Sequence, residues 1–110
     1  MDVNELTERS QEVASYLKVL ANPSRLLILC ELNQGERSVS ALETAVGLAQ
    51  SALSQHLAKL RESGIVATRR DAQTIYYRLA DPKVERMMGT LYELFCAPQA
   101  VSSRTKSRGK

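Results

Sequence analysis

The sequence predicts a mainly α-helical fold with one small β-hairpin. Three leucines recur at helical spacing within Gln50–Glu62, which indicates an amphipathic helix. The segments 65–69 and 74–79 are instead rich in β-branched and aromatic residues, and the polar residues 70–73 between them are typical of a turn. Further helices are indicated by an asparagine or aspartate directly before a proline, because the first residue can cap a helix that the proline begins.

Two helices are expected before the middle of the chain. Asn4 can cap the first of them, whose apolar residues gather in its C-terminal half. Asn22 caps a second helix that starts at Pro23, and Gly35 ends it. Since residues 26–32 (LLILCEL) leave almost no polar face, this second helix is predicted to be buried at the centre of the fold.

Two more helices joined by a short turn are expected next. Ser40 and Glu43 have the spacing of a capping box, which would open a short helix reaching about Val46. Gly47 closes this helix, and the helix Gln50–Glu62 follows it. Two helices joined in this way are typical of a helix-turn-helix.

The outward face of the Gln50–Glu62 helix is polar at its N-terminal end. Short hydroxyl and amide side chains hydrogen-bond base edges and phosphates, and a helix is narrow enough to enter a major groove. The face is therefore interpreted as a DNA-reading surface. An ordinary solvent-exposed helix has similar patterning, so the residues of this helix alone leave both interpretations open.

A hairpin and a last helix complete the expected order. Gly64 stops the preceding helix, and the turn 70–73 gives the hairpin a charged tip that can reach a phosphate or a minor groove. Asp81 then caps a helix that Pro98 ends. Its apolar stripe consists of Val84, Met87, Met88, Leu91 and Phe95.

Length and charge fit one small domain with local basic regions. The chain has 110 residues and a net charge of +3. Residues 56–78 carry five basic and two acidic side chains, which favours a nucleic-acid partner for this stretch rather than for the whole surface. Residues 1–97 are expected to form the domain, and residues 98–110 a basic disordered tail. With no evident signal peptide or spanning segment, a cytoplasmic protein without a membrane partner is expected.

The stretch QSALSQHLAKLRESGIVATRRDAQTIYYRL, together with NPSRLLIL in the second helix, resembles the ArsR/SmtB family of small dimeric bacterial repressors. The resemblance covers roughly residues 10–97 and implies a winged helix-turn-helix with four helices, two strands and a fifth helix. It also implies a homodimer formed through the first and last helices, with double-stranded palindromic operator DNA as its partner. By the same resemblance, DNA contacts fall on Gln50, Ser51, Ser54, Gln55, His56, Arg69, Arg70 and Gln73. For His56, a packing role is the alternative.

Metal binding is not expected, although many members of that family bind metals. One common family site has Cys-x-Cys where this chain has Ser38-Val39-Ser40, and another needs histidines that the last helix lacks. The chain has a single histidine, whereas zinc normally takes about four Cys, His or carboxylate ligands. No metal or cofactor is therefore assigned.

The two cysteines, Cys30 and Cys96, are open to two interpretations from the residues alone. They can be an inert buried thiol and an idle terminal thiol, or a redox pair. Their placement resembles the persulfide- and redox-responsive BigR/SqrR/HlyU subgroup of the family. The resemblance implies that reactive sulfur species or an oxidant bridge the two thiols as a disulfide or polysulfide and release the repressor from DNA. A constitutive or metal-responsive repressor with structural cysteines remains the alternative.

An enzyme is not expected. The sequence shows no Ser-His-Asp set, no glycine-rich phosphate loop and no pair of carboxylates suited to one cleft. Two cysteines far apart on helices, without a cofactor motif, do not indicate turnover.

Overall fold

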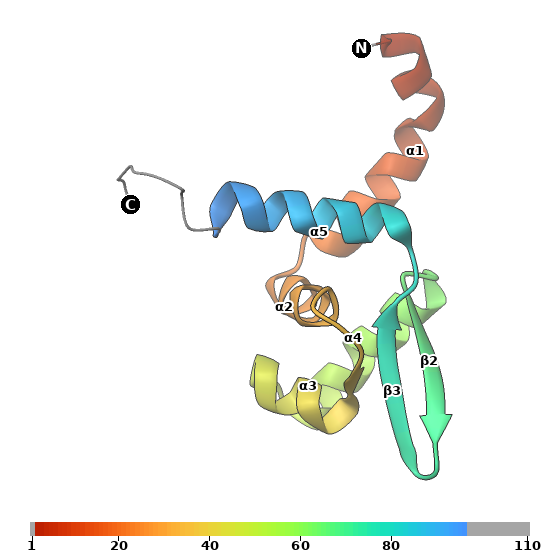
Figure 1. Ribbon diagram of the computed structural model, residues 1–110. Coiled ribbons are helices and arrows are strands. Elements are labelled where there is room, and N and C mark those ends of the chain that lie inside the picture. The colour runs from red at the N-terminus through yellow and green to blue at the C-terminus, as the bar shows by residue number, and fades with distance from the viewer. Residues whose placement is uncertain (1, 97–110) are drawn as a thin grey trace.

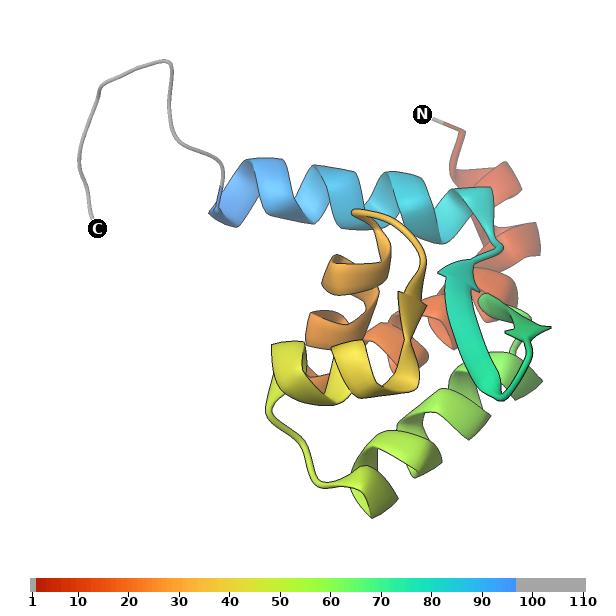
Figure 2. The ribbon, with the colours of Figure 1, turned by 60° about the horizontal axis from the view of Figure 1, so that its bottom comes forward.

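The computed structural model describes residues 2–96, which form helices around a central helix and a small antiparallel sheet (Figure 1). The mainly helical fold with a β-hairpin is confirmed. The elements are α1 (Val3–Leu20), α2 (Pro23–Leu32), β1 (Arg37–Ser38), α3 (Val39–Val46), α4 (Gln50–Glu62), β2 (Val66–Asp71), β3 (Thr74–Leu79) and α5 (Pro82–Phe95). Helix α5 lies across one end of the molecule, and α3, α4 and the hairpin lie toward the other (Figures 1 and 2).

One apolar core joins all five helices to the hairpin. Its buried members are Leu20, Ile28, Leu29, Leu32, Leu42, Leu53, Leu57, Leu60, Ile65, Val66, Tyr77, Val84 and Met88. Helix α2 contributes three of them and packs against α1, α3 and β3, as expected for a central helix. The prediction that α2 is buried nearly all round is wrong at its N-terminal half, where Leu27 is 55% exposed.

Two predicted helix starts are wrong by two residues. Helix α1 begins at Val3, and its cap is Asp2 rather than Asn4, because the Asp2 carboxylate accepts the backbone N–H of Asn4 at 2.9 Å. Helix α3 begins at Val39 with Ser38 as its cap, so the predicted box of Ser40 and Glu43 does not open it. The cause is tertiary, since residues 37–38 pair with β3 as a short strand that the sequence did not reveal.

Helix α4 has the predicted bounds, and its end shows why. The backbone N–H of Ile65 donates to Leu60 O, and that of Gly64 donates to Arg61 O, both at 3.0 Å. This pair of bonds is a Schellman motif, and Gly64 adopts the positive φ of 74° that it requires.

The hairpin is longer and its turn tighter than predicted. Strand β2 continues to Asp71, which pairs with Thr74, so the turn consists of Ala72 and Gln73 instead of residues 70–73. Ala72 has φ 59°, a conformation that a two-residue hairpin turn demands and that alanine rarely adopts. The pairs Arg70–Ile75 and Asp71–Thr74 therefore lengthen this hairpin, the wing, at the cost of local strain.

Helix α5 begins as predicted, with Asp81 accepting the backbone N–H of Lys83 at 2.9 Å. Its apolar stripe leaves the core along its length. Val84 and Met88 are buried, whereas Phe95 is 79% exposed. The predicted stop at Pro98 and the predicted tail 98–110 lie outside the described residues.

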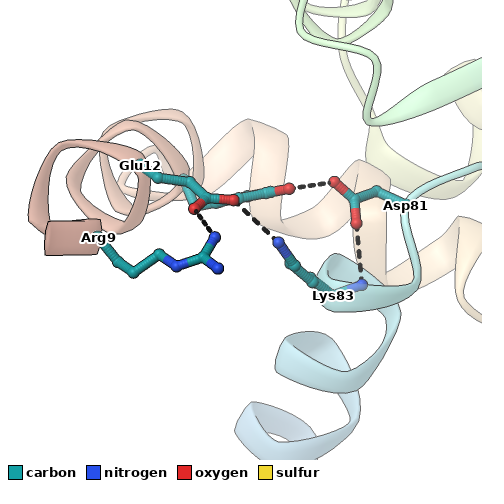
Figure 3. A network of polar contacts seen from close by, with 5 residues as sticks. Arg9, Glu12, Asp81 and Lys83 are labelled. Carbon is teal, nitrogen blue, oxygen red and sulfur yellow. Dashed lines mark hydrogen bonds and ion pairs between the residues drawn. The ribbon is translucent and has the colours of Figure 1, made fainter. Parts of the chain in front are cut away.

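A polar network ties α1 to the start of α5 (Figure 3). The Tyr16 hydroxyl donates to Asp81 Oδ2 at 2.5 Å, so the residue that caps α5 also holds α1. Lys83 Nζ donates to Glu12 at 2.9 Å, and Arg9 pairs with the same carboxylate at 3.1 Å. The hydrogen bond to Asp81 raises the pKa of the Tyr16 hydroxyl, and that from Lys83 lowers the pKa of the Glu12 carboxyl.

Within residues 2–96, no single helix is both long and apolar enough to cross a membrane. By length and composition, α1 and α2 pass the same test only as a pair bent by 94°.

Replacing Tyr16 by Phe should lower the free energy of unfolding by about 1 kcal/mol, because Asp81 loses a part-buried hydrogen bond. Urea unfolding monitored by circular dichroism measures this change. Tyr92→Phe is the control, since the exposed hydroxyl of Tyr92 has no hydrogen-bond partner among the described residues. Equal stability of the two variants would show that the Tyr16–Asp81 contact contributes nothing.

Candidate nucleic-acid interface and thiol pocket

The outward face of α4 starts with a row of exposed polar side chains. Leu53, Leu57 and Leu60 are at most 2% exposed and anchor the opposite face in the core. The four predicted contact residues at the start of the helix are all exposed: Gln50, Ser51, Ser54 and Gln55. His56 is half-buried at the side of the helix.

The N-terminus of α4 offers backbone donors. Its cap residue is Ala49, which makes no side-chain capping hydrogen bond. The first N–H groups of a helix have no partner within the helix, so an anion such as a phosphate can accept them. The preceding turn is fixed by Gly47, which has φ 70° and donates its N–H to Glu43 O at 3.0 Å.

The wing tip reaches the same region of the surface as the start of α4. Gln50 and Gln73 both line a shallow hollow of about 300 Å³, together with Ser38, Val39, Ser40, Thr74 and Ile75. Arg70 is exposed on β2, two residues before Ala72 in the turn. Helix start and wing tip can therefore contact one continuous ligand.

Arg69 differs from the other predicted contact residues because it is engaged within the protein. Its Nε and Nη2 atoms donate to the Glu36 carboxylate at 2.8 to 3.0 Å, and its guanidinium lies 4.4 Å from the centre of the Tyr76 ring. These hydrogen bonds hold the pKa of the Glu36 carboxyl below its usual value and raise that of Arg69. Arg69 thus fixes the middle of β2 to the segment after α2.

Sequence reasoning missed Glu36. Its partner lies 33 positions away, and an isolated glutamate after a glycine gives no signal of such a pairing. The local pattern revealed the arginines of the wing but not that Arg69 forms an ion pair within the protein.

A second hollow, of about 360 Å³, adjoins Cys30 at the end of α2. It is lined by Cys30, Asn33, Gln34, Met88, Gly89 and Tyr92. Cys30 is half-buried against the core, whereas Cys96 is exposed at the end of α5. The spacing of Gly89, Tyr92 and Cys96 puts them on one face of α5. Cys96 does not itself line the hollow. Its backbone N–H donates to Tyr92 O at 2.8 Å, so it lies one turn beyond the residues of α5 that do.

Both cysteines are free thiols. Within residues 2–96, no three His, Cys, Asp or Glu side chains gather as a metal site would need. Ser38 caps α3 by accepting the N–H of Ala41 at 3.1 Å.

Comparisons with known proteins agree with this geometry. A sequence model described as "bacterial regulatory protein, arsR family" matches residues 22–68. The biofilm growth-associated repressor of Agrobacterium fabrum is 51% identical over 94 residues, which cover 86% of this chain and 80% of that protein. The transcriptional activator HlyU of Vibrio cholerae is 45% identical over 96 residues, covering 87% and 89%. The crystal structure of the transcriptional repressor BigR from Xylella fastidiosa aligns with a TM-score of 0.84 at 46% identity, covering 88% and 99%.

The Glu36 carboxyl should titrate below the usual glutamate range, and Arg69→Gln should return its pKa toward that range. The ion pair is then complete above the ordinary glutamate pKa and is lost as the pH falls through the lowered value. NMR titration of the side-chain carboxyl measures both. Arg70→Gln removes the same charge one residue along the wing and should leave the value unchanged. Equal shifts in both variants would mean that Arg69 acts only as one of several nearby charges.

Proposed function

This chain belongs to the arsR family of bacterial regulatory proteins, and we propose that it is a homodimeric repressor whose hold on operator DNA is controlled by Cys30 and Cys96. Its relatives are transcriptional regulators with helix-turn-helix folds and not enzymes. The observation that carries the switch is the hollow between α2 and α5, which is lined by Cys30 and by residues of α5 that end one turn before Cys96.

In this proposal α4 enters the major groove. Gln50 and Gln55 can pair with adenine edges, and Ser51 and Ser54 can bond bases or phosphates beside the free N-terminus of the helix. His56 adds a contact through its exposed edge. In the wing, Arg70 and Gln73 reach the backbone or minor groove. Arg69 gives Nε and Nη2 to Glu36, which leaves its Nη1 side for a phosphate.

A second copy of the chain covers the exposed apolar residues of the terminal helices. Leu6 and Leu17 on α1 are 48% and 54% exposed, and Leu94 and Phe95 on α5 are 68% and 79% exposed. Apolar surface of this kind is typical of a dimer interface. Two-fold symmetry then presents two α4 helices to the half-sites of a palindrome, about 34 Å or a multiple of that apart.

The thiol chemistry needs one sulfane-sulfur donor. The Cys30 thiolate attacks the outer sulfur of an organic persulfide, R–S–SH, which gives Cys30–S–SH and releases the thiol R–SH. The Cys96 thiolate then attacks the Cys30 sulfur, so that a disulfide forms and hydrogen sulfide leaves. The two cysteines lose two electrons, and the donor sulfur gains them. A second sulfur transfer before closure gives a polysulfide bridge, which spans a longer gap than the 4.4–6.8 Å between Cα atoms that a disulfide accepts.

The alternative is a constitutive or metal-responsive repressor with structural cysteines. The packing of half-buried Cys30 against the core favours it, because a buried thiol behaves as a small apolar side chain. Tight stoichiometric binding of zinc or arsenite in equilibrium dialysis would support this alternative over the thiol switch.

Replacing Arg70 by Ala should weaken binding to an operator duplex and reduce the slope of log affinity against log salt by about one, because one phosphate contact is lost. Fluorescence anisotropy measures both, with a duplex selected by the protein from a random library. Lys18→Ala removes the same charge from the last turn of α1, outside the helix-turn-helix and the wing, and should change neither. If the two variants behave alike, the wing does not contact the backbone through Arg70.

Replacing Cys30 by Ser should leave DNA binding of the reduced protein intact and abolish its response to an organic persulfide. The serine hydroxyl cannot accept the sulfane sulfur, so neither modification nor bridging follows. Anisotropy with parallel intact-mass measurement records both. A full response of the variant would refute the thiol switch. Unchanged DNA binding by a fully bridged wild-type protein would keep the repressor and discard the switch.

A further inference from the structure

The hollow beside Cys30 is lined without charged groups. Asn33 and Gln34 have neutral carboxamide side chains, and α5 contributes Met88, Gly89 and Tyr92. A carboxamide can donate a hydrogen bond to a ligand or accept one from it, whereas none of these groups carries a charge that would neutralise a carboxylate or an ammonium. A molecule with charged substituents would lose water here without gaining an ionic partner.

Gly89 is an unusual residue for its position. It lies inside the 14-residue helix α5, where glycine is less favourable than any residue except proline. Its backbone has no positive φ that would require glycine. A Cβ built on it meets no atom of the described residues within 4 Å, so close packing against these residues does not require glycine either. The missing side chain instead leaves open space on the wall of the hollow.

We propose that Gly89 keeps this hollow open as a binding site for a small sulfur donor without charged substituents, such as a dialkyl trisulfide, and limits the size of the donor that reaches Cys30. The proposal rests on the thiol switch proposed above and names its ligand class. The Cys30 thiolate attacks an outer sulfur of R–S–S–S–R, so that Cys30–S–S–R forms, the adjacent S–S bond breaks and the persulfide anion R–S–S⁻ leaves. The cysteine sulfur is oxidised, and the trisulfide is reduced.

The test compares two alkylating probes of nearly equal size, uncharged iodoacetamide and anionic iodoacetate. They are applied to the Cys96→Ser chain, in which Cys30 is the only cysteine. Intact mass gives each rate, and each rate is divided by the rate on the same chain unfolded in urea, which removes the intrinsic difference between the probes. We expect the folded protein to favour iodoacetamide at least tenfold more than the unfolded chain does. Equal preferences would overturn the uncharged-ligand assignment.

Variants of Gly89 in the same background test the size limit. Gly89→Leu fills the hollow and should slow iodoacetamide at least tenfold, and Gly89→Ala, which adds a single methyl group to the wall, should slow it less than Gly89→Leu does. Thr90→Leu adds a leucine side chain to the neighbouring position, which lines a different hollow, and should stay within about threefold of the parent. An unchanged rate in folded Gly89→Leu would overturn the proposal. So would loss of the dimer in Gly89→Ala, because glycine would then serve packing between copies.

Two features keep the test decisive. If Gly89→Leu does not fold, the probe preference of the unaltered glycine chain still decides whether the hollow selects its ligand. The alkylation rates of Cys30 are measured without DNA, so they test the hollow independently of whether modification of Cys30 changes DNA binding. If the reaction rate at Cys30 depends on probe charge and on Gly89, but modification of Cys30 does not change DNA binding, only the thiol switch is refuted. If modification of Cys30 releases DNA, but its rate does not depend on the residue at position 89, only the proposed role of the hollow is refuted.

Discussion

Burial of Ile28 and Leu29 in α2 is the constraint on which the rest of the molecule depends. Both side chains are fully buried, and burial of an aliphatic side chain of this size stabilises a fold by about 1.5–3 kcal/mol. Because α2 packs against α1, α3 and β3, these two residues hold the terminal helix, the helix-turn-helix and the wing in one arrangement. The same helix carries Cys30 directly after Leu29, at the margin of the core, where a thiol is held in place and still adjoins a hollow.

The segment that follows α2 joins the thiol region to the DNA-facing surface. Asn33 and Gln34 line the hollow beside Cys30, and Glu36 binds Arg69 of the wing. Ser38 then pairs with β3 and caps α3. Six consecutive residues, 33–38, therefore contact the thiol hollow, the wing and the start of the helix-turn-helix. In the proposed switch, a bridge that draws α5 toward α2 changes the walls of the hollow, and this short segment carries the change to the wing.

Local signals predicted much of the fold and fewer details of the sites. The bounds of α4 were correct because leucine spacing and Gly64 act within a few residues of one another. The start of α3 was wrong because Arg37 and Ser38 pair with Tyr77 and Tyr76, a contact that only the folded chain makes. For the same reason the sequence revealed the wing arginines but not the Glu36 partner of Arg69. It also showed both cysteines, whereas the hollow at Gly89 depends on how α2 and α5 pack.

The most direct test follows DNA binding and the state of the two thiols in one titration. Aliquots of the DNA complex, treated with increasing organic persulfide, give the fraction of protein bound to DNA by anisotropy and the fraction with Cys30 joined to Cys96 by mass spectrometry. The account predicts that the loss of binding follows the bridged fraction point by point. Binding that persists in fully bridged protein, or that disappears before any bridge forms, would contradict it.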